Sequence, residues 1–222
     1  MIFAIDNVLT LEELQILVDS LEQADFVDGK TTAGWYAKLV KNNMQLQREA
    51  TYANDLRELV KTALKRNVLF QSAVQPKIIH SMLFSRYEKG MSYGRHVDNA
   101  LMGNQEFLRS DVSFTLFLSV PSTYEGGELV IEYSDGDRTY KLEAGSMIVY
   151  PSSTLHQVEP VIEGVRLAAV GWVQSLVRDP NDREILFDLD TARRSIFAKE
   201  GKTIEFDLIS KSYANLLRKW AE

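Results

Sequence analysis

The chain contains no cysteine among its 222 residues. This absence excludes disulfides, iron–sulfur clusters, thiolate zinc sites and cysteine nucleophiles. A metal ion could therefore be bound only by oxygen and nitrogen ligands, and only three histidines are present to supply imidazole nitrogen. A chain without cysteine also fits a cytoplasmic protein.

Long apolar runs are missing as well. No stretch approaches the roughly 20 apolar residues that span a bilayer, and the N-terminal residues 1–6 lack the basic and apolar regions of a secretory signal. The net charge of −6 argues against a general nucleic-acid binder, which usually carries a basic face. We therefore predict a cytoplasmic protein that binds neither a membrane nor a nucleic acid.

The hydrophobic periodicity changes twice along the chain. The first 70 residues are predicted to be helical, with one helix from the Thr10–Glu13 capping box to about residue 24 and a second over 52–65. After Pro76 the pattern alternates, which predicts strands over 77–87, 111–119, 127–133, 138–143, 146–150, 154–158 and 165–174. The pattern is helical again after residue 178, with Asp179 as the expected cap and Pro180 at the first helical position. A last helix over 204–221 is expected to bury Leu208, Ile209, Leu216 and Leu217.

Many short strands separated by turns are typical of a sandwich or barrel, and a jelly roll is the version that best suits a metal site. The predicted fold is mainly β with flanking α. Residues 1–76 form an N-terminal helical support region, 77–177 the core, and 178–222 a C-terminal helical subdomain. The apolar terminal helices could pack on the core or on a second copy of the chain, which would make a homo-oligomer.

A histidine and a carboxylate stand two positions apart in the segment 93–98. In an extended strand such side chains point to the same face, so His96 and Asp98 could reach one metal ion together. His156 is a possible third ligand, whereas His80 lies beside apolar residues and is interpreted as a core residue or as one that supports the ligands from behind. Two histidines and one carboxylate form the facial triad of non-haem Fe(II) oxygenases, which leaves positions open for substrate and O₂.

Arg166 begins a strand and shares its face with mostly apolar side chains. A buried guanidinium needs an anionic partner, and its planar fork suits a carboxylate bound through two hydrogen bonds. Two partners remain open at this point. One is an internal carboxylate such as Glu143 or Glu163, and the other is a dicarboxylic co-substrate bound to the metal at its far end.

The order of these elements resembles a known family. Tyr87-x5-Tyr93-x2-His96-Val97-Asp98-Asn99, then Glu125-Gly126-Gly127-Glu128-Leu129, then His156-x9-Arg166 is similar to the prolyl 4-hydroxylase-like Fe(II)/2-oxoglutarate dioxygenases, over residues 77–175. The segment 171–179 with its helical tail resembles the bacterial PKHD-type hydroxylases, whose members are often associated with iron uptake.

The resemblance implies a double-stranded β-helix (jelly-roll) core with Fe(II) bound by His96, Asp98 and His156. It implies that Arg166 binds the C5 carboxylate of 2-oxoglutarate, with Tyr87 as a second contact, and that L-ascorbate serves as reductant. The implied activity is hydroxylation of an unidentified small-molecule or protein substrate, coupled to O₂-dependent conversion of 2-oxoglutarate to succinate, with a link to iron homeostasis.

Two other functions stay open at the level of sequence. The first is a non-enzymatic iron or 2-oxoglutarate sensor on the same fold, and the second is a hydrolase with Zn²⁺ or Mn²⁺ at the same triad. The polar loop over 99–110 is expected to act as a lid over the metal. Related enzymes often carry a Thr or Ser shortly after the arginine, whereas residues 167–170 offer no hydroxyl, so Tyr87 or Tyr93 would take that role.

Overall fold

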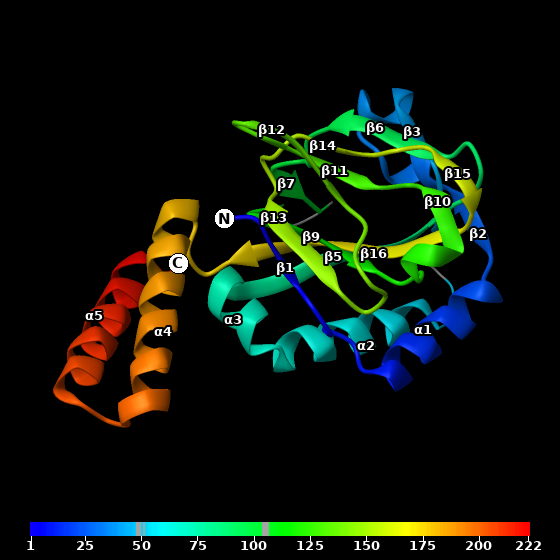
Figure 1. The fold of residues 1–222 in the computed structure, drawn as a ribbon. Helices are drawn as coiled ribbons and strands as arrows, with labels where there is room; N and C mark the ends of the chain where they lie inside the picture. Colours follow the sequence, from blue (N-terminus) through cyan, green and yellow to red (C-terminus); the bar gives the residue numbers. More distant parts are fainter. Residues whose placement is uncertain (48–49, 51, 104–106) are drawn as a thin grey trace.

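A computed structural model describes residues 1–47, 50, 52–103 and 107–222. Its centre is two facing sheets, one above the other in Figure 1. All neighbouring strands of the larger sheet are antiparallel. Its spatial order is β1 (Phe3–Ile5), β13 (Met147–Pro151), β9 (Val112–Phe117), β16 (Arg166–Ser175), β5 (Pro76–Tyr87), β4 (Met44–Leu46) and β2 (Phe26–Asp28).

The smaller sheet is also antiparallel. Its order is β12 (Gly136–Tyr140), β11 (Leu129–Tyr133), β14 (His156–Val158), β6 (Ser92–His96) and β3 (Lys41–Asn42). Two short ribbons complete the β structure, β10 (Tyr124–Gly126) with β15 (Val161–Gly164) and β7 (Leu101–Met102) with β8 (Leu108–Arg109). This jelly-roll core confirms the predicted mainly-β fold with flanking helices.

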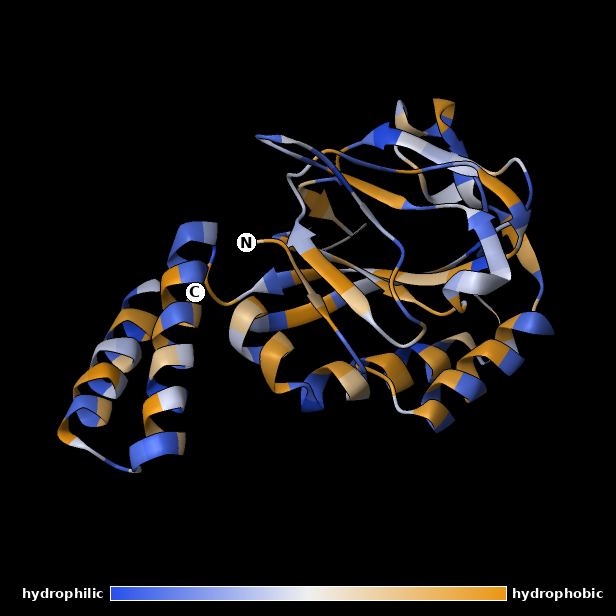
Figure 2. Ribbon diagram, viewed as in Figure 1, coloured by the Kyte–Doolittle hydropathy of each residue, from blue (hydrophilic) through white to orange (hydrophobic). Residues whose placement is uncertain are grey.

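Three helices cover the outer face of the larger sheet, and their apolar sides turn toward it (Figure 2). They are α1 (Leu11–Glu22), α2 (Ala53–Arg66) and α3 (Val68–Val74). α1 begins at Thr10 with the predicted capping box, and α2 lies within one residue of its predicted bounds. The short 3-10 helices are η1 (Gly29–Thr32), η2 (Ala37–Leu39) and η3 (Pro121–Thr123).

The alternation of β9 explains why this sheet can support both a core and a site. Val112, Phe114 and Leu116 belong to the apolar cluster shared with α1–α3, whereas Phe117 belongs to a second cluster between the sheets. Because side chains alternate along a strand, Ser113 and Thr115 share the inner face with Phe117. Polar groups are thereby presented to the space between the sheets.

The predicted helical character of the first 70 residues is wrong for several short segments. β1, β2 and β4 pair in the larger sheet, and β3 pairs with β6 in the smaller one. Strands of two or three residues are too short to show alternation, so only pairing with distant strands defines them. Six of the predicted strands are confirmed to within two residues, while the strand predicted over 138–143 runs instead over 136–140. The division at residues 76 and 177 stays a prediction.

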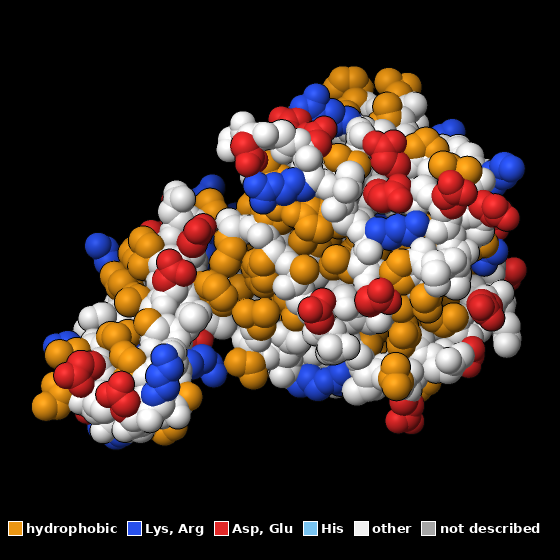
Figure 3. All heavy atoms as spheres, in the orientation of Figure 1, with side chains coloured by type: hydrophobic (Ala, Val, Ile, Leu, Met, Phe, Trp, Pro, Cys, Tyr) orange, Lys and Arg blue, Asp and Glu red, His pale blue; other side chains and the backbone are white. Residues whose placement is uncertain are grey.

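The C-terminal segment is a hairpin of α4 (Pro180–Glu200) and α5 (Ile204–Trp220) that stands beside the core (Figure 1). Asp179 caps α4 and Pro180 occupies its first turn, as predicted. The expectation that α5 buries four apolar residues is wrong, because no residue of this helix is buried and Leu208 is 52% exposed. A two-helix hairpin has too few neighbours to enclose its apolar side chains, and hydrophobic side chains are visible on its surface in Figure 3.

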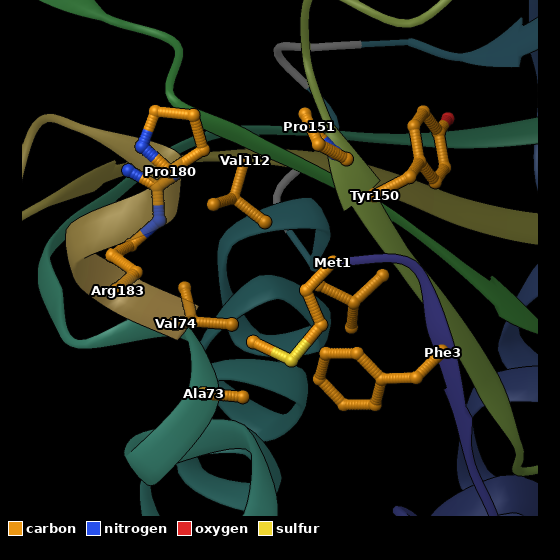
Figure 4. Close-up of a pocket in the computed structure, with 10 residues that line it drawn as sticks. Met1, Phe3, Ala73, Val74, Val112, Tyr150, Pro151, Pro180 and Arg183 are labelled. Carbon is orange, nitrogen blue, oxygen red and sulfur yellow. The ribbon is translucent and has the colours of Figure 1, made fainter. Parts of the chain in front are cut away.

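A small cavity marks the junction between this hairpin and the core. Side chains of the N-terminus, α3, β9, β13 and the start of α4 line it (Figure 4). Arg183 donates hydrogen bonds to the carbonyls of Val177 and Arg178 at 2.7 and 2.8 Å, and the amino group of Met1 lies 3.4 Å from Glu184. Arg183 thus joins the first turn of α4 to the segment that precedes it, and the Met1–Glu184 ion pair joins α4 to the N-terminus.

Candidate active site

Pairing of β6 with β14 brings the two candidate histidine ligands together. His96 and His156 are opposite each other in the register, and their ring centroids lie 4.3 Å apart. Asp98 follows the end of β6, and its Oδ2 lies 3.9 Å from Nε2 of His156. One ligand atom from each of the three residues lies within 4.8 Å of the other two. The structure therefore places all three predicted residues in one cluster.

Both imidazoles are oriented by backbone carbonyls. Nδ1 of His96 lies 2.8 Å from the oxygen of Gly94, and Nδ1 of His156 lies 3.0 Å from the oxygen of Thr154. A carbonyl only accepts, so each Nδ1 carries the proton and each Nε2 keeps its lone pair. Burial, followed by the neighbouring His156, lowers the pKa of His96 to about 4. His96 is thus neutral at pH 7 and able to act as a ligand.

Asp98 is oriented from the inner face of β9. The Ser113 hydroxyl donates a 2.6 Å hydrogen bond to Oδ2 of Asp98 and lies 2.8 Å from the Ser152 hydroxyl. Both serines are buried. Partners of this kind hold a ligating carboxylate in position and tune its basicity. Sequence reasoning missed this role, because a serine within a strand carries no signal of what it faces.

Arg166 lies at the start of β16, opposite Tyr87 of β5. Its side chain is 1% exposed, and its guanidinium lies 5.1 Å from the ring centroid of Tyr87 and 5.4 Å from that of Phe117. Nε and Nη2 are buried, with no hydrogen-bond partner among the described residues. The alternative of an ion pair with Glu143 or Glu163 is not realised in the described part of the chain. A buried guanidinium with unpartnered donors indicates an anion-binding position.

The paired glycines before β11 give the arginine its space. Gly127 has a φ of +67°, and a Cβ placed there would lie 2.9 Å from Cγ2 of Val161 and 3.1 Å from Cδ of Arg166. Side chains are therefore disfavoured both by the backbone conformation and by contact. The absence of a side chain at Gly127 therefore allows close packing on the site.

The cluster and Arg166 open into one cavity of about 1220 Å³, whose wall also includes Tyr87, Tyr150 and Trp172. The indole nitrogen of Trp172 is buried without a hydrogen-bond partner among the described residues. His80 lines the same cavity but lies outside the cluster, with Nε2 3.2 Å from the carbonyl oxygen of Arg109. The interpretation of His80 as a residue other than a ligand agrees with this placement.

The predicted lid over 99–110 contributes Asn99 and residues 101–103 to the cavity wall. Its residues 104–106 lie outside the described residues. A second wall comes from the N-terminal segment between β2 and β4, which sequence reasoning treated only as support. In this segment the Tyr36 hydroxyl donates to the carbonyl oxygen of Val97 at 3.2 Å, next to Asp98.

Lys41 also lines the cavity, although no sequence motif points to it. It is 5% exposed, on the edge strand β3, and opposite Tyr93 of β6. Its Nζ donates to the Thr32 hydroxyl at 3.1 Å and lies 5.0 Å from the Tyr93 ring centroid. Tyr93 in turn stacks on His96, with the two ring centroids 3.6 Å apart. Burial lowers the pKa of Lys41 to about 8, against the opposing effect of Asp98.

The donor set fits ferrous iron. Two imidazole nitrogens with free lone pairs and one carboxylate converge, and such a set binds Fe(II) while leaving positions open for exogenous ligands. The unpartnered donors of Arg166 fit the distant carboxylate of a dicarboxylic acid.

No helix among the described residues has the length and apolar character needed to cross a membrane.

Comparison with known proteins agrees with this geometry. Residues 82–174 match the 2OG-Fe(II) oxygenase superfamily, and residues 181–222 match the PKHD-type hydroxylase C-terminal domain. The chain is 67% identical to PKHD-type hydroxylases of Rippkaea orientalis and of Acaryochloris marina, in each case over 222 residues and the full length of both chains.

Solved structures share the fold at low sequence identity. A prolyl-4-hydroxylase of Pseudomonas putida is 18% identical with a TM-score of 0.54, over 78% of this chain and 92% of that one. An oxidoreductase of the 2OG-Fe(II) oxygenase family from Burkholderia pseudomallei is 16% identical with a TM-score of 0.57, over 78% and 84%. The 67% identity to these relatives extends over the full length of the chain, and both family models match it. The chain therefore belongs to the PKHD-type hydroxylases, enzymes of the 2OG-Fe(II) oxygenase superfamily that use Fe(II), 2-oxoglutarate and O₂.

Proposed function

We propose that His96, Asp98 and His156 hold the Fe(II) of this hydroxylase and that Arg166, with Tyr87, holds the C5 carboxylate of 2-oxoglutarate. The observation that carries the assignment is the buried guanidinium with unpartnered donors, which lines the same cavity as the ligand cluster. A structural arginine would be expected to have its donors satisfied within the protein.

Bound Fe(II) would supply the site at which O₂ and 2-oxoglutarate react, coupling decarboxylation to succinate and CO₂ with hydroxylation of the substrate. The chain's own residues prepare this chemistry. The carbonyls of Gly94 and Thr154 fix the tautomers of the histidines, and Ser113 orients Asp98. Arg166 orients the co-substrate from the opposite sheet, so that its keto-acid end is directed at the cluster.

Several finer features belong to the same proposal. L-ascorbate would act as the reductant that keeps the iron ferrous, in a cytoplasmic enzyme that could form a homo-oligomer. The substrate is a small molecule or a protein side chain, and a link to iron homeostasis rests on the family resemblance alone. Succinate yield per enzyme with and without ascorbate tests the reductant role, since loss of yield over repeated turnovers is expected when it is omitted.

The assignment is tested with anaerobic protein supplied with Fe(II) and 2-oxoglutarate. A visible charge-transfer band is expected, followed by O₂-dependent succinate release, and Asp98→Ala should lose both. A band without any consumption of 2-oxoglutarate would indicate the sensor function. Turnover of another substrate without O₂ would indicate the hydrolase.

A further inference from the structure

The cavity wall is positively charged in a protein whose net charge is −6. Its charged side chains among the described residues are the cations Lys41, Arg57, Lys61 and Arg166 and the single carboxylate Asp98. Arg57 donates to the carbonyl of Met82 and to Asn54, and Lys61 is ion-paired with Glu58 at 2.8 Å. Lys41 and Arg166 are the two cations of this wall that are nearly inaccessible to solvent.

Lys41 has polar and aromatic neighbours but no carboxylate in contact. Within the described residues its ammonium donates to Thr32 and lies over the ring of Tyr93, and no ion pair involves it. The two carboxylates that act on it electrostatically, Asp98 and Asp28, lie beyond ion-pairing distance. A buried ammonium without a paired anion is costly, so the position requires a function or a missing partner.

The charges of the proposed iron site do not supply that partner. A divalent iron and the Arg166 guanidinium carry three positive charges. Asp98 and the two carboxylates of 2-oxoglutarate carry three negative ones. The net charge of this group is zero, so it provides no counter-charge for the Lys41 ammonium.

Lys41 is also on a different sheet from Arg166. It belongs to the edge strand β3 of the smaller sheet, while Arg166 belongs to the centre of the larger sheet. Tyr93 contacts both Lys41 and His96, so its ring lies between the ammonium and the ligand cluster. An anion bound to Lys41 would be held beside the metal, at a position distinct from the C5 carboxylate site.

Building on the proposed function, we propose that Lys41 binds a carboxylate of the substrate and so directs a nearby C–H bond of a small carboxylic acid toward the metal. Because Lys41 is 5% exposed, the carboxylate must enter the cavity to reach it. A lysine of purely structural role would instead only hold Thr32, and with it the segment between β2 and β4, in place.

Binding to the anaerobic Fe(II) and 2-oxoglutarate complex, measured by calorimetry, tests this proposal. The probes are the N-acetyl derivatives of proline, lysine and norvaline, each as the free acid and as the primary amide. For at least one of the three pairs, the wild-type protein is expected to bind the acid about tenfold or more tightly than the amide, because a charge-assisted hydrogen bond is lost in the amide. Lys41→Met is expected to bind acid and amide equally.

Two further variants separate binding from folding. Lys41→Arg should restore part of the preference for the acid, and Lys61→Met, which removes a cation paired with Glu58 on the same wall, should leave it intact. Equal affinity of the wild type for every acid and its amide, or binding of none, overturns the proposal. A loss in Lys41→Met of 2-oxoglutarate affinity in place of acid preference would also overturn it. The charge-transfer band of the wild type reports on the iron and co-substrate assignment separately.

Discussion

The hydroxyl of Ser113 donates a 2.6 Å hydrogen bond to Oδ2 of Asp98, which links the inner face of the larger sheet to the ligand cluster. Ser113→Ala leaves this carboxylate without its orienting donor, so we expect Fe(II) affinity to fall by about 10- to 100-fold. Anaerobic Fe(II) titration measures this change. Ser119→Ala removes a hydroxyl that donates to the carbonyl of Val165 and accepts from the amide of Leu167, away from the cluster, and should leave the Fe(II) affinity unchanged. Equal affinities in the two variants would show that Ser113 does not support the metal.

His156→Ala tests the cluster itself. Removal of one of the three proposed ligands should reduce the Fe(II) retained after desalting to background, whereas His80→Ala should keep the wild-type amount. His80 is the matched control because it lines the same cavity yet bonds the carbonyl of Arg109. Equal iron in both variants, measured by metal analysis, would remove His156 from the ligand set.

Arg166→Met tests the proposed co-substrate site through its effect on 2-oxoglutarate binding and its effect on stability. Loss of the guanidinium should raise the apparent KM for 2-oxoglutarate by about 100-fold, as expected for a hydrogen-bonded charge pair. Since the guanidinium is buried with unpartnered donors, we expect Tm without 2-oxoglutarate to be no lower than that of the wild type. The increase in Tm caused by 2-oxoglutarate should disappear. A large fall in Tm with an unchanged KM would mean that the arginine is structural.

Gly127→Ala should act on the site through packing. Its Cβ would press on Val161 and on Cδ of Arg166, so we expect 2-oxoglutarate affinity to fall by about tenfold in addition to a loss of stability of about 1–3 kcal/mol. Gly136→Ala is the control. Gly136 also has a positive φ, +125°, but a Cβ there meets nothing within 4 Å. Gly136→Ala should be destabilised by backbone strain alone and should keep the wild-type affinity for 2-oxoglutarate. Kinetic titration with 2-oxoglutarate distinguishes the two variants.

The lowered pKa of His96 predicts a pH dependence of stability in the metal-free protein. The unfolded chain binds this proton with a pKa near 6.5, whereas the folded chain binds it only near pH 4. The stability that the neutral imidazole contributes is fully present above about pH 6.5 and is lost as pH falls toward 4, and the loss amounts to about 2–3 kcal/mol by pH 4.5. His96→Gln should lack this component. Urea unfolding of both proteins from pH 7 to 4.5 measures it, and parallel curves would contradict the assignment.

Much of the core could be predicted because its signals are local. β5, β9 and β16 are long enough to show alternation, and α1 and α4 begin at the capping residues identified in the sequence. β1–β4 could not be predicted, because two or three residues show no period and pair only with strands distant in sequence. The exposure of α5 was mispredicted for a related reason, since periodicity shows which face is apolar but not whether anything covers it.

The sequence alone determined which donor types are available to a metal, since a chain without cysteine and with three histidines leaves few ways to hold one, and His96 and Asp98 stand two positions apart in it. Tertiary structure alone decided that His156 lies opposite His96, that Ser113 reaches Asp98, and that Arg166 is buried with unpartnered donors. It also decided that Lys41 lines the same cavity. The physical reason is that ligand types are properties of single residues, whereas convergence, burial and unmet charge exist only once distant strands pair.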